Sequence, residues 1–195
     1  MPVYQLVSST TGVVSLADAK AHLREDPDVT DHDAVITDLV AAAEDHVRMM
    51  LGRALLPEVW TASFDQPGPM GNLLIDRPVN GISKVELLQG GSYVVQDASS
   101  YVMRPRGSYA ALVRPAIPVG QTYAGWPPVD TDEAAYRVTF SDGWENASSV
   151  PASIVAAIKM IAGDMHTNRD GSRLSNIVDN PAVPRLLAPW RVPVL

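Results

Sequence analysis

The spacing of apolar residues changes twice along this chain, and these changes constrain its fold more than any single motif does. From Leu16 to Leu23, and again from Ile36 to Leu51, apolar residues recur every three or four positions, which is typical of one face of an α-helix. Between Glu58 and Phe140 they form short runs separated by glycine and proline, and beyond Pro151 the helical spacing returns. This order predicts helices at both ends of the chain and a β-rich segment between them.

The front helices have recognisable ends. Ser15 and Asp18 have the spacing of a capping box, which predicts a short helix from about Leu16 to Arg24. A second helix is expected from roughly Asp33 to Leu51, because Gly52 adopts at little cost the left-handed conformation that ends helices. Two residues are candidate N-caps of this helix: Thr30 or Asp31.

The middle segment carries two candidate hairpins. The glycine pair at 90 and 91 is one expected turn, and the stretch from Arg104 to Ser108, with a proline and a glycine, is the other. We therefore predict an α+β fold that is mainly a helical bundle, with two long helices plus short helices and a small antiparallel β-rich insertion at about residues 58–140. Residues 1–195 are expected to form a single domain with a C-terminal tail at about 181–195.

The composition disfavours several classes of function. Phosphate affinity depends on clustered lysine and arginine, so a net charge of -7 with scattered basic residues disfavours general nucleic-acid binding. No run approaches the ~18 apolar residues that span a bilayer, and no membrane association is expected. The absence of cysteine removes disulfides and thiolate nucleophiles, and it suits a reducing compartment such as the cytoplasm.

No familiar catalytic motif is present, whether nucleophile elbow, zinc-protease helix, Walker loop or dinucleotide fingerprint. The densest group of possible metal ligands comprises Asp26, Asp28, Asp31, His32 and Asp33. Because this segment lacks the central glycine and terminal glutamate of a calcium-binding loop, we interpret it as an acidic linker. The alternative is a small cation-dependent hydrolase that uses Asp31, His32 and Asp33. The leading expectation is a protein that is not an enzyme and that has no catalytic residues, metal or cofactor.

The four tryptophans are expected to serve two purposes. Trp60 and Trp144 are predicted to pack in the core, whereas Trp126, in the proline-rich loop from Pro115 to Asp130, and Trp190, in the tail, are candidate interface anchors. A third hypothesis, stacking on single-stranded nucleic acid, is disfavoured because basic residues are not interleaved with the tryptophans.

Several segments, in their joint order and spacing, resemble the head-tail connector, or adaptor, proteins of tailed bacteriophages and gene transfer agents. These segments are Ser15 to Arg24, Asp31 to Leu55, Leu73 to Leu88, Tyr136 to Trp144 and Val150 to Asp170. The resemblance covers nearly the whole chain. The proline-rich loop departs from the family pattern, which leaves the contacts on the tail side open.

The resemblance implies a structural subunit that forms a ring of about twelve copies below the portal protein and joins capsid to tail. It implies that the ring extends the channel and lets DNA pass without sequence-specific binding, and that an isolated subunit can be monomeric. It also implies portal binding by the C-terminal region, where we expect Arg185, Leu186, Leu187, Trp190, Arg191 and Val192 to dock. Trp126 is a candidate contact of the next tail-side connector component. Assembly is expected in the host cytoplasm and the final location at the head-tail interface of the virion or gene transfer agent particle.

Overall fold

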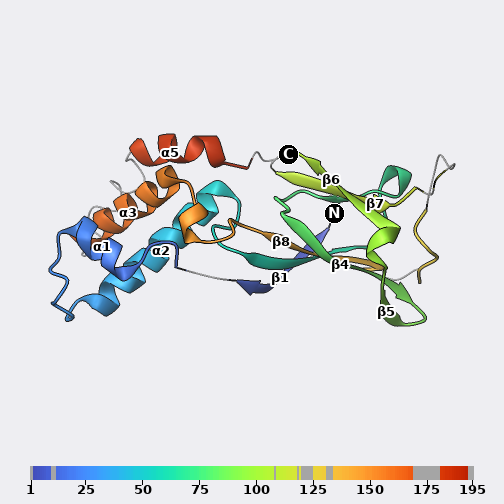
Figure 1. Ribbon diagram of the computed structural model, residues 1–195, viewed down its shortest axis with the longest axis horizontal. Coiled ribbons are helices and arrows are strands. Elements are labelled where there is room, and N and C mark those ends of the chain that lie inside the picture. Colours follow the sequence, from blue (N-terminus) through green and yellow to red (C-terminus); the bar gives the residue numbers. More distant parts are fainter. Residues whose placement is uncertain are drawn as a thin grey trace. The chain divides into compact units, whose positions relative to one another are not determined.

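The chain forms two compact units, each with its own apolar core (Figure 1). The computed structural model describes residues 2–9, 12–107, 109–117, 119, 125–130, 134–168 and 181–192. The unit called here the α unit comprises Thr10–Leu56 and Trp144–Arg191, and the β unit comprises Met1–Ser9, Pro57–Gly143 and Val192–Leu195. This division into units does not test the expectation that residues 1–195 form a single domain, which stays a prediction.

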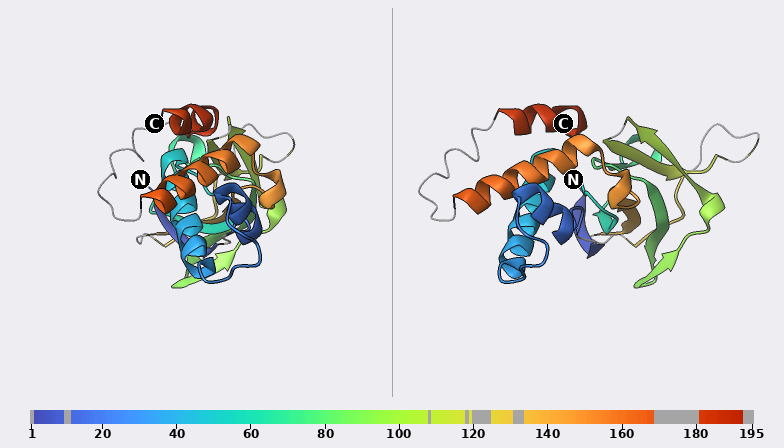
Figure 2. Two further views of the ribbon diagram at one scale, coloured as in Figure 1. Left: turned by 90° about the vertical axis from the view of Figure 1, so that its left-hand side faces the viewer. Right: turned by 60° about the vertical axis from the view of Figure 1, so that its left-hand side comes forward.

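Helices from both ends of the chain build the α unit. Among the described residues these are α1 (Leu16–Leu23), α2 (Asp33–Leu51), α3 (Ala152–Thr167) and α5 (Ala182–Leu187). Their apolar faces meet in a core in which Ile36, Val47 and Ile158 are fully buried. α2 packs on α3, and α5 lies alongside α3 (Figure 2). The helical periodicity on either side of the β segment therefore belongs to one core.

The front helices begin and end close to the positions predicted from the sequence. Ser15 Oγ accepts a hydrogen bond from the Asp18 backbone N–H at 3.1 Å and so caps α1. α2 spans the predicted residues and ends at Gly52, whose φ of 68° is left-handed. Its N-cap is His32 rather than Thr30 or Asp31, because the Thr30 carbonyl accepts from the Asp33 N–H in a turn before the helix.

Two antiparallel sheets build the β unit. The larger sheet has the strand order β1-β2-β8-β4-β5, and the smaller has the order β3-β7-β6. The strands are β1 (Val3–Ser9), β2 (Glu58–Phe64), β3 (Leu73–Ile75), β4 (Gly81–Gln89), β5 (Ser92–Val95), β6 (Tyr101–Arg106), β7 (Ala110–Pro115) and β8 (Tyr136–Asp142). β8 is the central strand of the larger sheet and pairs with both β2 and β4. Most of the larger sheet thus depends on pairing between distant parts of the chain.

The inward faces of the two sheets share one core. Leu73 and Val113 of the smaller sheet belong to the same buried cluster as Val85, Val138 and Phe140 of the larger sheet, and all five are fully buried. Successive residues of a strand point to opposite faces, so the residues between these core positions in β3, β6 and β7 project from the outer face of the smaller sheet. That outer face is described below.

The expected fold class is wrong. The chain is not mainly a helical bundle with a small β insertion, because the described residues form eight strands in two sheets beside four helices. β1 had no counterpart in the sequence prediction, since it becomes a strand by pairing with β2, far along the chain. Short runs that are completed by distant partners carry a weak local signal, and their contribution to the fold was underestimated.

The two predicted hairpins are both present, and the second is longer than expected. Gly90 and Gly91 connect β4 to β5 with φ values of 60° and 77°. β6 continues through Arg106, and Gly107, with a φ of 66°, lies in the turn that precedes β7. Arg104, expected in a turn, is therefore a strand residue whose side chain has a defined face of the sheet.

Candidate partner-binding surfaces

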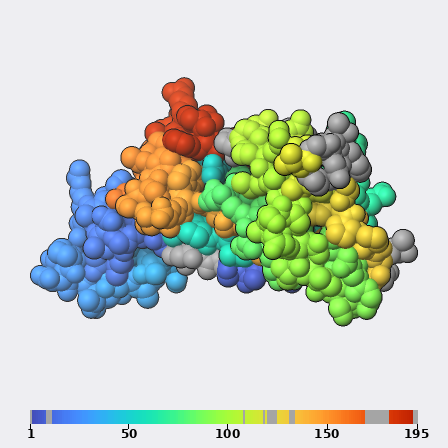
Figure 3. All heavy atoms as spheres, turned by 45° about the vertical axis from the view of Figure 1, so that its right-hand side comes forward, coloured from blue at the N-terminus to red at the C-terminus, as the bar shows by residue number. Residues whose placement is uncertain are grey.

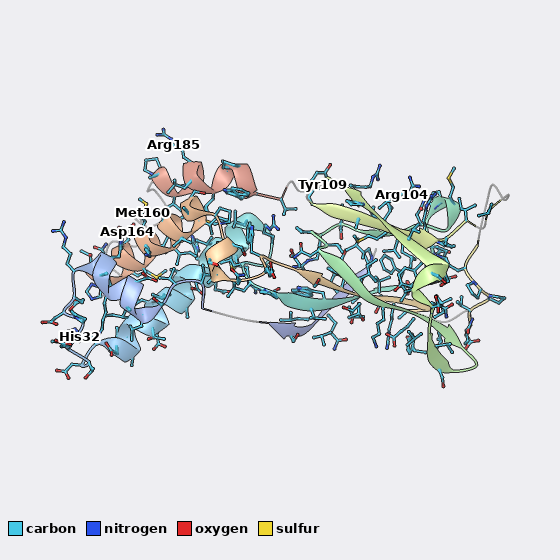
Figure 4. All side chains as sticks on the ribbon, in the orientation of Figure 1. His32, Arg104, Tyr109, Met160, Asp164 and Arg185 are labelled. Carbon is cyan, nitrogen blue, oxygen red and sulfur yellow. The ribbon has the colours of Figure 1, made fainter. Side chains whose placement is uncertain are left out.

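The C-terminal segment expected to dock on a partner folds back onto the α unit. Within α5, Val183 and Leu187 are 3% and 2% exposed and belong to the helical core, and Leu186 packs partly against the same core. Arg185 is exposed and points away from α3 (Figure 4). α5 is therefore amphipathic, with one face used by its own unit and the other open to a partner.

The 3-10 turn η4 (Ala188–Trp190), which follows α5, holds a tryptophan at the surface of the α unit. Trp190 Nε1 donates a hydrogen bond to Ser153 Oγ at 3.0 Å, and the ring meets Trp144 edge-to-face with centroids 6.2 Å apart. The Arg53 guanidinium lies over Trp144, 4.2 Å from the ring centroid. These contacts position a ring that stays 37% exposed, and a pre-positioned aromatic side chain suits an interface anchor.

The six residues expected to bind the portal are thus not equivalent. Three of them are exposed and are called here the C-terminal surface: Arg185, Trp190 and Arg191. Leu186 and Val192 are half-buried, and Leu187 lies inside the core. Figure 3 shows α5 and η4, in red, lying on α3, in orange. Residues 193–195 of the predicted tail lie outside the described residues.

Trp126, expected to be a contact on the tail side, packs against the β unit and forms a hydrogen bond with it. Its Nε1 donates a hydrogen bond to the Gly71 carbonyl at 2.7 Å, and its ring packs edge-to-face on Tyr136 with centroids 6.2 Å apart. The side chain is half-buried against the β core. Trp126 therefore ties residues 125–130 to the sheets, while residues 118, 120–124 and 131–133 lie outside the described part of the chain.

The acidic segment before α2 is organised around a buried lysine. Lys20, 5% exposed, forms an ion pair with Asp33 and donates hydrogen bonds to the carbonyls of Pro27 at 3.3 Å and Val29 at 2.7 Å. Among the residues that the structure describes, no group of three histidine, aspartate or glutamate side chains could hold a metal ion. The arrangement matches the acidic linker rather than the cation site of the hydrolase hypothesis.

Other carboxylates of this segment face solvent. Asp31 and His32 are both exposed, and Figure 4 shows His32 at the start of α2, pointing outward. Two exposed valines lie among the acids, Val29 and Val35, each 44% exposed. We call the following group the acidic surface: Asp26, Asp28, Asp31, Asp38, Val29 and Val35.

A cleft of about 320 Å³ in the α unit brings together side chains from α1 and α3. Its lining includes His22, Met160, Asp164 and His166, of which Figure 4 labels Met160 and Asp164. His166 Nε2 lies 3.4 Å from a carboxylate oxygen of Glu25, which follows the C-cap of α1. None of the described helices is both long enough and apolar enough to cross a membrane.

The outer face of the smaller sheet gathers arginines that sequence reasoning had treated as scattered. In the β6–β7 pair Val102 lies opposite Arg114, and Arg104 lies opposite Leu112. Opposite residues share a face, as do residues two apart, so these side chains project together. We call the group the arginine face: Arg104, Arg106, Arg114, Leu74, Val102 and Leu112. A sequence signal did exist, because the chain has no aspartate or glutamate from Ala98 to Val129.

Comparison with known proteins agrees with the sequence resemblance in the front of the chain. Residues 13–85 match the family described as phage gp6-like head-tail connector protein. This region includes α1, α2, β2, β3 and the first half of β4. A search among curated proteins found no match.

Solved structures share the fold over almost the full length of the chain. One described as the neck of an empty GTA particle computed with C6 symmetry superposes with a TM-score of 0.73 at 18% identity, covering 99% of this chain and 97% of its own. A native gene transfer agent (GTA) virion gives 0.73 at 18% identity, with 98% and 96% covered. The neck of a native GTA particle computed with C12 symmetry gives 0.64 at 19% identity, with 98% and 97% covered.

Proposed function

We propose that this chain, whose residues 13–85 match the family of phage gp6-like head-tail connector proteins, is a structural subunit that joins capsid to tail. The supporting observation is the combination of that match with a fold shared along 99% of the chain with a protein of a GTA particle neck. The family match covers the front of the chain, and the structural likeness extends across both units.

The subunit would act in a ring of identical copies below the portal. The structural relatives come from necks computed with C6 and C12 symmetry, which is the setting in which a ring forms around the particle axis. A ring requires heterologous contacts, in which one surface of a copy meets a different surface of its neighbour. The two units, with different exposed side chains, offer such surfaces.

We assign portal binding to the C-terminal surface. Arg185, Trp190 and Arg191 are exposed on a segment that the α unit holds in place, so binding would not have to order a free tail. Pre-organisation of this kind lowers the entropic cost of association. Leu187 is excluded from the contact, because its side chain fills the unit's own core.

The ring would extend the channel through which DNA passes. A conduit works best when it does not hold its cargo, and a net charge of -7 limits the counterion release that drives tight DNA binding. The next tail-side component would bind the β unit near Trp126. Assembly would take place in the host cytoplasm, and the chain would stay in the finished particle as a non-enzymatic part.

Particles produced without the chain test the connector function. We expect DNA-filled heads that lack tails, counted by electron microscopy, and restoration of tails when the gene is supplied in trans. Complete tailed particles in the absence of the chain would refute the proposal.

Portal binding is tested separately with purified portal protein. Arg185→Glu/Arg191→Glu should weaken binding about tenfold or more, because two cations of one contact are reversed. Lys84→Glu, which reverses an exposed cation on β4, is the matched control and should bind normally. If the unchanged protein, the double variant and Lys84→Glu all bound the portal equally, the C-terminal surface would not be part of the contact.

A further inference from the structure

The arginine face is an unusual concentration of positive charge in an acidic chain. Arg104, Arg106 and Arg114 project from one side of the smaller sheet, and Figure 4 shows Arg104 extending from it. Among the residues that the structure describes, no carboxylate forms an ion pair with any of the three, and Arg114 Nε is buried without a hydrogen-bond partner. Arg104 and Arg106 are exposed and Arg114 is half-buried, so the arginine face can receive an external anionic partner.

The acidic surface of the α unit has the opposite character. From Glu25 to Asp38 the chain contains no lysine or arginine. Lys20 neutralises Asp33, and His166 lies against Glu25, which leaves the outward carboxylates of the segment exposed. Asp26, Asp28, Asp31 and Asp38 thus form a negative patch on the same chain that carries the arginine face.

The two surfaces also match in their apolar content. Leu74 and Val102, each 38% exposed, lie among the arginines, and Val29 and Val35, each 44% exposed, lie among the acids. Arginine interleaved with apolar side chains is typical of protein interfaces. Phosphate contacts to DNA use arginine but give exposed aliphatic side chains no partner. These features favour a protein over DNA as the occupant of the arginine face.

We propose that the arginine face of one copy binds the acidic surface of the next copy in the ring. This inference rests on the connector function proposed above. Because the two surfaces differ and lie on different units, each contact leaves one free surface of each kind, so addition continues until the ring closes. A self-complementary dimer, which would stop after two copies, is not the product of such a contact.

Charge reversal in assembled particles tests the contact with two matched variants. Arg104→Glu/Arg106→Glu makes both surfaces acidic, and Asp28→Arg/Asp31→Arg makes both basic; all four residues are exposed. Each variant, supplied as the only copy, should lower the yield of particles with a neck and tail about tenfold or more, because like charges then face each other across the contact. Lys84→Glu is the control for a charge reversal elsewhere on the β unit and should give normal particles.

Co-expression of the two variants provides the decisive measurement. Copies with two acidic surfaces can then alternate in the ring with copies that have two basic surfaces, which should restore tailed particles. A single chain that carries all four substitutions should also restore them, because its acidic β-unit face can bind the basic α-unit surface of the next copy. Circular dichroism and melting temperatures equal to those of the unchanged protein ensure that each variant is folded.

Several outcomes would overturn the inference. Normal particles from either variant alone would show that the contact is not needed, and failure of co-expression to restore tails would show that the arginine face meets something else. Particles with intact necks that fail to retain DNA would assign the arginine face to nucleic acid. Loss of tails when the chain is omitted, with normal particles from the reversals, would leave the connector function standing and remove only this contact.

Discussion

The α unit and the β unit use buried polar groups in different ways. In the α unit, Lys20 and Glu44 lie within the structure and hold loops to helices: Glu44 accepts hydrogen bonds from the backbone N–H groups of Gly12 at 3.2 Å and Val14 at 2.9 Å. In the β unit, buried Glu58 accepts a hydrogen bond from Trp60 Nε1 at 2.9 Å and buried Asp142 accepts one from the Gly143 backbone N–H at 2.6 Å, so these carboxylates bind near neighbours in the sequence. Its strands pair in ladders, and its arginine face projects outward. The loops of the α unit are therefore held in place by a few side chains, whereas the stability of the β unit rests on the apolar core between its two sheets.

Truncation of a core residue should have the largest effect on stability, and it should destabilise one unit more than the other. Phe140→Ala should cost about 4 kcal/mol, since a fully buried aromatic ring leaves a cavity between the sheets. Hydrogen exchange should show loss of protection in β2, β4 and β8, with α2 and α3 less affected. Ile158→Ala, also fully buried, is the counterpart in the α unit and should give the opposite pattern. Equal loss in both units from either change would mean that they unfold as one.

Removal of the buried lysine tests the dependence of the α unit on polar anchors. Lys20→Met should cost about 2 kcal/mol, because it removes an ion pair with Asp33 and two hydrogen bonds to linker carbonyls. Urea denaturation measures this loss. Lys84→Met removes an exposed ion pair of the β unit and should cost less than about 0.5 kcal/mol. A similar cost for both lysines would erase the contrast.

The anchoring of Trp190 is expected to contribute a smaller amount. Trp190→Phe keeps an aromatic ring near Trp144 but loses the donor to Ser153, so we expect about 1 kcal/mol of destabilisation. Ser153→Ala should cost a similar amount, and the double variant should cost little more than either. Fully additive losses would show that the hydrogen bond does not hold η4.

The smallest expected effect is confined to alkaline pH. Burial and a hydrogen bond to Asp76 raise the pKa of Tyr4 well above its ordinary value of 10.0. The folded state thus keeps a proton that the unfolded state releases near pH 10, so this stabilisation is complete below that pH and is lost as pH rises above it. Between about pH 9 and 11, Tyr4→Phe should lose less stability than the unchanged protein.

Urea denaturation at both pH values measures this difference. Burial also raises the pKa of Tyr136, so the substitution should reduce the alkaline loss without abolishing it. An unchanged pH dependence in Tyr4→Phe would show that this phenol does not contribute.

The helices were predictable because their signals are local. The Ser15 cap, the apolar stripe of α2 and the stop at Gly52 all act within a few residues, and the structure keeps each of them. The hairpin at Gly90 and Gly91 was predictable for the same reason. The docking segment stays a prediction, and the difference between exposed Arg185 and buried Leu187 required the position of α5 on the core.

The sequence pattern alone was therefore enough to place the helices and the acidic linker and to find no familiar catalytic motif, since each of these depends on residues that are close together along the chain. The weight of the β unit, the strand β1 and the arginine face came from pairing between distant segments. A strand has no internal hydrogen bonds to mark it, and the face on which its side chains gather is set by the register of its partners. Folding thus converts arginines that look dispersed in the sequence into one charged surface.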